Sequence, residues 1–126
     1  MDHNRSTTIE EIFTSEVIAA SGTAYSRVFD VKQLAGNAAL QILMTGDGTG
    51  KFEWVGTLDE DAVVADFVKV NNSNDIVTAF TKTSGPGGDG RHVYGFNVSL
   101  VKNLAIKVTE TGGADSIIVT AIIALQ

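Results

Sequence analysis

The chain has 126 residues, a hydrophobic content of 44%, a net charge of −6 and no cysteine. This length fits one domain and the hydrophobic content supplies its core, so a largely disordered chain is excluded. The absence of cysteine excludes disulfides, zinc–thiolate sites and thiol nucleophiles, and the scattered Lys and Arg residues argue against nucleic acid or an anionic membrane as a partner.

The N-terminal residues fit two local structures. Thr8 and Glu11 form a helix capping box, and a set of apolar residues lies near helical spacing. We expect an arm over residues 1–14 that ends in a short helical turn or an edge strand, followed by one domain over residues 15–126. The alternative for the arm is a plain disordered tail. The apolar residues that could contact a neighbouring subunit are Ile9, Ile12 and Phe13.

Short runs rich in Val, Ile, Thr and Phe follow, separated by Gly, Asn, Asp and Ser. Spacing of about ten residues between turns is typical of a sandwich or barrel. We therefore expect an all-β, antiparallel β-sandwich of jelly-roll type, with strand content well above the usual 20–25%. The expected strands are Ala24–Lys32, Ala38–Thr45, Lys51–Gly56, Asp75–Lys82, His92–Ser99, Leu104–Glu110 and Ser116–Leu125, with two further candidates at Glu16–Ala20 and Val63–Val70.

Two of these segments alternate between apolar and polar residues. Leu40, Ile42 and Met44 would share one face of a strand, with Gln41 and Thr45 opposite. The same pattern places Leu104, Ile106 and Val108 on one face, against Lys107 and Thr109. We expect both apolar sets to face the core.

The last segment, Ile117–Leu125, is apolar at nearly every position, although it is far shorter than the roughly 20 residues of a membrane helix. A strand that is apolar on both faces needs a second cover in a two-layer sandwich. Either another part of the chain or a neighbouring subunit could supply that cover. Ile118 and Ile123 are the candidates for the outward side, and the sequence leaves open which of them points outward.

Nucleotide binding is disfavoured. Residues 85–90 match G-x-G-x-x-G, but Arg91 to Tyr94 reads as a strand, and the motif binds pyrophosphate only where it opens a helix. We interpret these glycines as a hairpin loop.

Metal binding and catalysis are also disfavoured. Asp59, Glu60 and Asp61 lack the spacing of a calcium loop, and His3 and His92 have no partner at metal-binding spacing. No motif pairs a nucleophile with a base. We expect no catalytic residue, no metal site and no cofactor, and hence not an enzyme.

The order of these segments resembles small β-sandwich proteins of tailed phages and prophages, which include capsid decoration (cement) proteins and tail or fibre components. The resemblance covers nearly the whole chain and rests on Ser26–Val31, Ala39–Ile42, Phe52–Trp54, the glycine-rich loop, Val93–Phe96 and Ala105–Gly113. It implies a structural virion protein, assembled in the host cytoplasm, whose partners are further copies of itself, with a trimer as one form, and a major capsid or other virion protein.

The alternative function is a carbohydrate-binding or adhesive module. Trp54, Tyr25 and Tyr94 could stack on sugar rings if they were exposed. Because Phe52 and Trp54 share one face of an expected strand, we expect that face to lie in the core.

Overall fold

The computed structural model describes residues 7–31, 34, 36–69, 75–98 and 101–126. Strands hold 58% of the described residues, and no α-helix occurs among them. A single short 3-10 helix, η1, covers Val64–Asp66 in this part of the chain. The strands in chain order are β1 (Thr8–Ile18), β2 (Thr23–Tyr25), β3 (Phe29–Asp30), β4 (Asn37–Thr45), β5 (Gly50–Thr57), β6 (Asp75–Phe80), β7 (Arg91–Asn97), β8 (Asn103–Glu110) and β9 (Ile117–Leu125).

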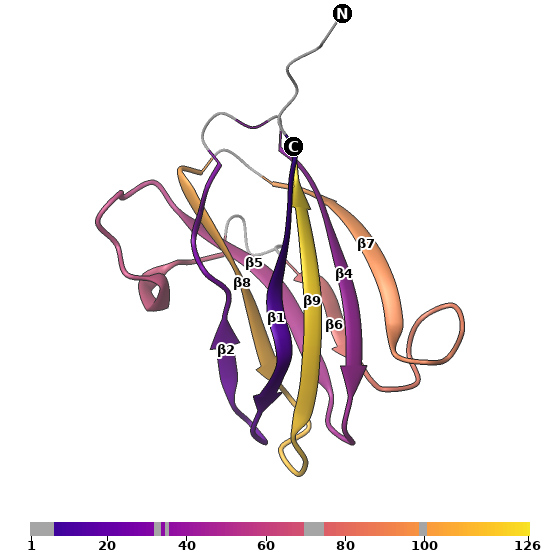
Figure 1. Cartoon of the computed structure of the whole chain (residues 1–126). Helices are drawn as coiled ribbons and strands as arrows, with labels where there is room; N and C mark the ends of the chain where they lie inside the picture. Colours follow the sequence, from indigo (N-terminus) through magenta and orange to yellow (C-terminus); the bar gives the residue numbers. More distant parts are fainter. Residues whose placement is uncertain (1–6, 32–33, 35, 70–74, 99–100) are drawn as a thin grey trace, which may run out of the picture.

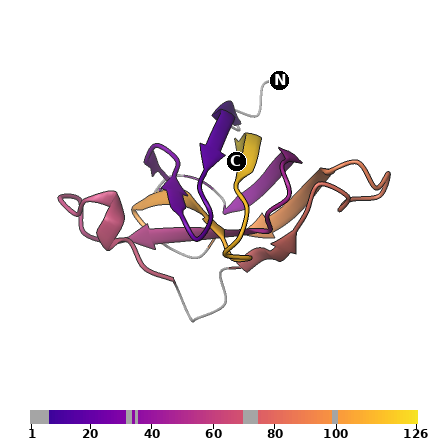
Figure 2. The same ribbon diagram turned by 90° about the horizontal axis from the view of Figure 1, so that it is seen from below.

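The strands form two antiparallel sheets packed face to face (Figures 1 and 2). One sheet has the order β1-β9-β4-β7 and the other the order β2-β8-β5-β6, with β3 also paired to β8. Because β2 and β3 lie on the same side of β8, they are two parts of one edge strand. With that strand counted once, the two orders are those of a jelly roll, so the expected all-β sandwich is confirmed.

Ser26 explains why this edge strand is interrupted. Its backbone N–H donates to the carbonyl of Ile106 at 2.8 Å, as in a regular ladder. The return bond from the Ile106 N–H goes to the Ser26 hydroxyl at 2.9 Å instead of to a carbonyl. The side chain thus replaces the backbone as acceptor, which satisfies the buried donor while the strand turns away.

The core lies between the sheets and follows the alternation expected from the sequence. Leu40, Ile42 and Met44 on β4 are fully buried, as are Leu104, Ile106 and Val108 on β8. Phe52 and Trp54 lie on the inner face of β5 with 0% and 4% exposure, so the expected core position of both rings is confirmed.

Of the two structures left open for the end of the N-terminal segment, the edge strand is the one that forms. Residues 8–18 form strand β1, so the segment expected as an arm over residues 1–14 contains more than half of an edge strand. Pairing with β9 at eight positions determines this structure, which local helical spacing could not reveal. Residues 1–6 lie outside the described residues, as do the expected strand ends at Lys32, Val70 and Ser99.

Strand β1 contains two irregularities. Its register with β9 shifts between Glu11 and Phe13 and again between Phe13 and Glu16. At the first shift, two consecutive side chains, Ile12 and Phe13, both pack against the core. At the second, Ser15 adopts a φ of 48° and donates its N–H to the Thr120 hydroxyl at 3.0 Å.

Two further expectations need correction. The candidate strand over 63–70 is instead the 3-10 helix η1 and a single bridge between Val68 and Gly56. The glycine-rich loop is not a hairpin loop, because β6 and β7 belong to different sheets. Its last glycine, Gly90, has a φ of +76°, and a Cβ there would approach the Met44 carbonyl to 2.5 Å, so the close approach of the loop end to β4 requires glycine.

Residues 62–67, between β5 and β6, cover part of the outer side of the β2-β8-β5-β6 sheet. Val55 and Ala105 point away from the main core, yet they are 2% and 0% exposed. Phe67 packs on both, and Ala62 and Val64 extend this second cluster. This sheet therefore buries part of its outer side within one chain.

A buried carboxylate ties three turns together at one end of the sandwich. Glu110, at the end of β8, is 1% exposed. It accepts backbone N–H groups from Ser21 and Thr49, both at 2.9 Å, and from Gly112 at 2.7 Å and Gly113 at 2.8 Å. These hydrogen bonds to the charged form lower the pKa of Glu110 from 4.5 to about 2.

Replacing Glu110 with Gln is expected to lower the thermal unfolding midpoint by several degrees at pH 7. An amide offers one oxygen acceptor instead of two, and it turns an N–H donor toward backbone donors. Because the folded-state pKa is lowered, the carboxylate stabilises the fold above pH 4.5, and this contribution is lost as the pH falls toward about 2. The difference between wild type and variant should therefore shrink over that range in calorimetric melts.

The matched control is Glu16→Gln, at an exposed position of β1, which should leave the midpoint unchanged. A difference between Glu110→Gln and wild type that stays constant down to pH 2 would contradict this role of the carboxylate.

Candidate functional site

The outward side of β9 carries apolar side chains. Burial alternates along Ile117–Leu125, so the even-numbered residues point away from the core. Ile118 is 37% exposed and Ile122 is half-buried. The open question of which side chains of this strand point outward is thereby settled.

Neighbouring strands extend this side into a continuous surface, which we call the outer face (Figure 1 looks onto it). Cross-strand partners share a face, so the pairing defines its rows from β1 to β7. The row nearest the C-terminus is Ile9, Ala124, Ala39 and Gly95. The next row is Glu11, Ile122, Gln41 and Val93. Beyond these follow Thr120, Leu43 and Arg91, and then Val17, Ile118 and Thr45.

Large apolar side chains of the outer face are in contact with solvent. Ile9 is 69% exposed, Val17 is 63% exposed and Val93 is 55% exposed. Burying one such side chain fully is worth about 1.5–3 kcal/mol. Single exposed apolar residues are ordinary on protein surfaces, but several on adjacent strands of one face are typical of an interaction surface.

A hollow of about 590 Å³ lies where the outer face meets the loop between β6 and β7. The strands contribute Gln41, Leu43, Arg91 and Val93, and the loop contributes Pro86, Gly87 and Asp89. Arg91 Nε lies 3.8 Å from Asp89 Oδ2, and both side chains are more than half exposed. The hollow therefore combines an apolar base with a charged border.

Of the five candidate interface residues, two lie on the outer face and three pack against the core. Ile9 and Ile118 lie on the outer face and are exposed. Ile123 is fully buried between the sheets, and Phe13 is 4% exposed, so both belong to the core and not to an outward surface. Ile12 is partly buried and also packs against the core, as alternation from Glu11 requires, and the first irregularity of β1 turns Phe13 to the same side.

Several residues of the outer face were not singled out from the sequence as interface residues. Leu43, Val93 and Arg91 all lie on strands that were expected. Their orientation follows from alternation, since Ile42 is buried and its neighbour Leu43 must then point outward. Alternation alone does not show whether such a side is covered by another segment.

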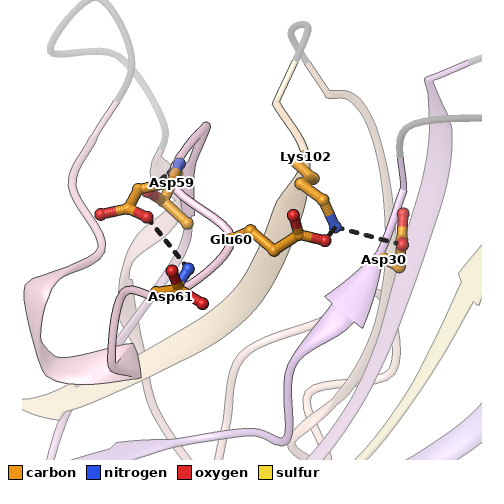
Figure 3. A network of polar contacts seen from close by, with 6 residues as sticks. Asp30, Asp59, Glu60, Asp61 and Lys102 are labelled. Carbon is orange, nitrogen blue, oxygen red and sulfur yellow. Dashed lines mark hydrogen bonds and ion pairs between the residues drawn. The ribbon is translucent and has the colours of Figure 1, made fainter.

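The acidic segment 59–61 participates in turn and ion-pair contacts (Figure 3). Asp59 accepts the backbone N–H of Asp61 at 2.9 Å. Lys102 Nζ lies 3.3 Å from Glu60 and 3.5 Å from Asp30, and the hydrogen bond with Glu60 raises the pKa of Lys102. Among the described residues, no three His, Asp or Glu side chains gather as metal ligands.

A second charged cluster lies on the β2-β8-β5-β6 sheet. Lys69 Nζ is 3.1 Å from Glu53 and 3.1 Å from Asp75, and Lys51 is 3.6 Å from Asp75. Hydrogen bonding to Glu53 and then to Asp75 raises the pKa of Lys69. Because Glu53 is only 3% exposed, its ion pair with Lys69 offsets the burial of the carboxylate, and the cluster stabilises the sheet edge.

The aromatic side chains do not form an exposed row of rings. Trp54 lies in the core, and Tyr94 packs edge-on against Phe80 with ring centroids 6.3 Å apart. Burial raises the pKa of Tyr94, and His92 stacks on its ring at 4.1 Å. The alternative of a sugar platform therefore lacks its tryptophan.

In the part of the chain that the structure describes, no helix is long and apolar enough to cross a membrane. No protein-family model matches the chain, and no curated protein matches it in sequence.

Solved structures share its fold. The chain is similar to part of tripeptidyl peptidase 2, with a TM-score of 0.62 and 12% identity, over 98% of this chain and 10% of that one. It is also similar to part of the protein of infectious bursal virus derived T=1 particles, with a TM-score of 0.53 and 6% identity, over 94% of this chain and 31% of that one.

The SPBc2 prophage-derived protein YomS is similar at a lower TM-score of 0.41, with 14% identity over 94% of this chain and 93% of that one. At these identities the likenesses show the fold alone, an all-β sandwich. The same architecture is found within a peptidase chain and within a virus particle, so function has to be inferred from the surface.

A pair of aspartate substitutions tests the orientation of β9. Ile123→Asp should unfold the protein or cost about 3–5 kcal/mol, because it places an unpaired charge in the core. Ile118→Asp should leave the fold intact, with a change within roughly 1 kcal/mol, because the new charge meets solvent. Circular dichroism and urea melts measure both, and equal destabilisation would contradict the orientation.

Proposed function

We propose that the chain is a structural protein of a virus particle, of the capsid decoration (cement) type, which acts by packing its outer face against other proteins of the particle and has no catalytic role. One observation carries the proposal. Ile9, Val17, Val93 and Ile118 are exposed together on the outer face, whereas Phe67 packs with Val55 and Ala105 on the outer side of the other sheet.

The size of the outer face suits an interface. Four strands about 4.8 Å apart, each with some eight residues at about 3.3 Å, present on the order of 500 Å² in projection. An interface of standard size buries about 800 Å² per partner, which is the same order once side-chain relief is included. The mixture of apolar side chains with Glu11, Gln41 and Arg91 is also usual for such surfaces.

In this proposal the partners are copies of the chain and a major capsid or other virion protein, and the chain joins the particle in the host cytoplasm. A fold that needs no disulfide is compatible with assembly in a reducing compartment. The protein then acts by burying its outer face against other subunits, and this binding stabilises the assembled particle.

Particle composition tests this function. Particles purified from cells that encode the chain should contain it at a constant ratio to the major shell protein, as measured by quantitative mass spectrometry. Ile122→Asp, at the centre of the outer face, should lower incorporation at least about tenfold, because burying an unpaired charge is costly. Leu58→Asp is the matched control, since Leu58 is an aliphatic residue with 74% exposure beyond the other sheet.

Particles without the wild-type chain, or equal incorporation of wild type and Ile122→Asp, would refute the proposal.

A further inference from the structure

We propose that the occupant of the outer face is a second copy of this chain, related by a twofold axis parallel to the strands, so that β1 of one copy lies over β7 of the other. This inference rests on the proposed function in one respect, namely that the outer face is an interface. It assigns the outer face to one of the two partners named above, a second copy, and adds the orientation in which that copy binds.

The two edge strands of the outer face carry opposite charges. Strand β1 contains Glu10, Glu11 and Glu16 and no Lys or Arg, whereas β7 contains Arg91 and no Asp or Glu. On the outer face itself these charges are Glu11 and Arg91, and both side chains are exposed. The nearest acid to Arg91 is Asp89 at 3.8 Å, in the neighbouring loop, so the guanidinium remains available to a partner.

Two orientations would bring the outer faces of two copies together with strands aligned within about 30°. An axis parallel to the strands exchanges the edges, so β1 meets β7 of the second copy. An axis across the strands keeps each edge over itself, so β1 meets β1. Glu11 lies in the row next to that of Arg91, so the first orientation brings Glu11 of each copy near Arg91 of the other. The twofold axis repeats this contact, and the second orientation does not form it.

Shape supports the same orientation. In the row nearest the C-terminus, the most exposed apolar residue of the face, Ile9, stands at the β1 end and Gly95 stands at the β7 end. The space above Gly95 is open, since an added Cβ would meet only the Ala38 carbonyl at 4.0 Å. Exchanging the edges places each bulky Ile9 over a Gly95, with Ala39 and Ala124 beside them.

Pairing through the free edge of β1 is the less suitable alternative. Two register shifts and the left-handed φ of Ser15 distort its backbone, and glutamates flank the distortion. Bulges and charges of this kind prevent an edge strand from adding a further strand. The regular rows of the face thus suit a partner better than the edge does.

Charge reversal tests the orientation, with the dimer dissociation constant measured by sedimentation equilibrium at low salt. Glu11→Arg should weaken the dimer about tenfold, and Arg91→Glu should do the same, because each places like charges together twice. The double variant Glu11→Arg/Arg91→Glu should return to within about threefold of wild type. The Glu11→Arg substitution changes the net charge from −6 to −4, so weakening would occur although the overall repulsion between copies falls.

Asp66→Arg is the matched control, because it makes the same change of charge on the segment that covers the other sheet and should leave the dimer unchanged. An unaltered or tighter dimer with Glu11→Arg would overturn the proposed orientation, since tightening is expected where β1 lies over β1.

Gly95→Leu supplies an uncharged test. The monomer should keep its fold, because the position is extended and open, while the new side chain fills the space proposed for Ile9 of the second copy. Dimer affinity should fall about tenfold, with unchanged circular dichroism. A Gly95→Leu dimer as tight as wild type would contradict the packing.

The two proposals fail in different ways. A wild-type chain that stays monomeric at high concentration, or that forms a trimer, overturns the twofold pair. If Ile122→Asp still abolishes incorporation into particles in that case, the proposed function stands and the occupant of the outer face is a different protein.

Discussion

Each sheet of this sandwich buries one side against the other sheet, because successive side chains of a strand point to opposite faces. The remaining side of each sheet must either be polar or find another cover. The chain resolves this differently for its two sheets, since Phe67 closes over Val55 and Ala105, while Ile122 and its row remain outside. The parity that places Ile123 in the core therefore also creates the outer face.

The alignment of the rows on the outer face depends on the turns that Glu110 holds at one end of the sandwich. Its carboxylate accepts N–H groups from the turns before β2, before β5 and before β9, so one side chain holds three connections in place. No cation among the described residues pairs with it, and the backbone dipoles alone stabilise the charge. Turns fixed in this way keep β9 in register with β1 and β4, on which the alignment of the outer rows depends.

Alternation in the sequence was sufficient to predict the sandwich and much of its core, because period-two patterns such as Leu40-Gln41-Ile42 report directly on burial. It could not predict features that depend on distant contacts. The strand character of residues 8–14 comes from pairing with β9, and the role of Glu110 comes from backbone groups far along the chain. Ile123 and Ile118 could not be distinguished from the sequence, because a strand that is apolar on both faces does not indicate which residues point inward.

The fold is compatible with several functions, since it occurs within a peptidase chain and within a virus particle protein. The composition of the outer face is more restrictive. A surface that binds a different protein needs only half of each contact, whereas one that binds its own copy across a twofold axis must contain both halves. The outer face has an exposed glutamate at one edge and an exposed arginine at the other, in adjacent rows, and a protruding Ile9 in the same row as the open Gly95. Both halves of two unrelated contacts, one electrostatic and one steric, are thus present on a single chain, which is the pattern that self-association requires.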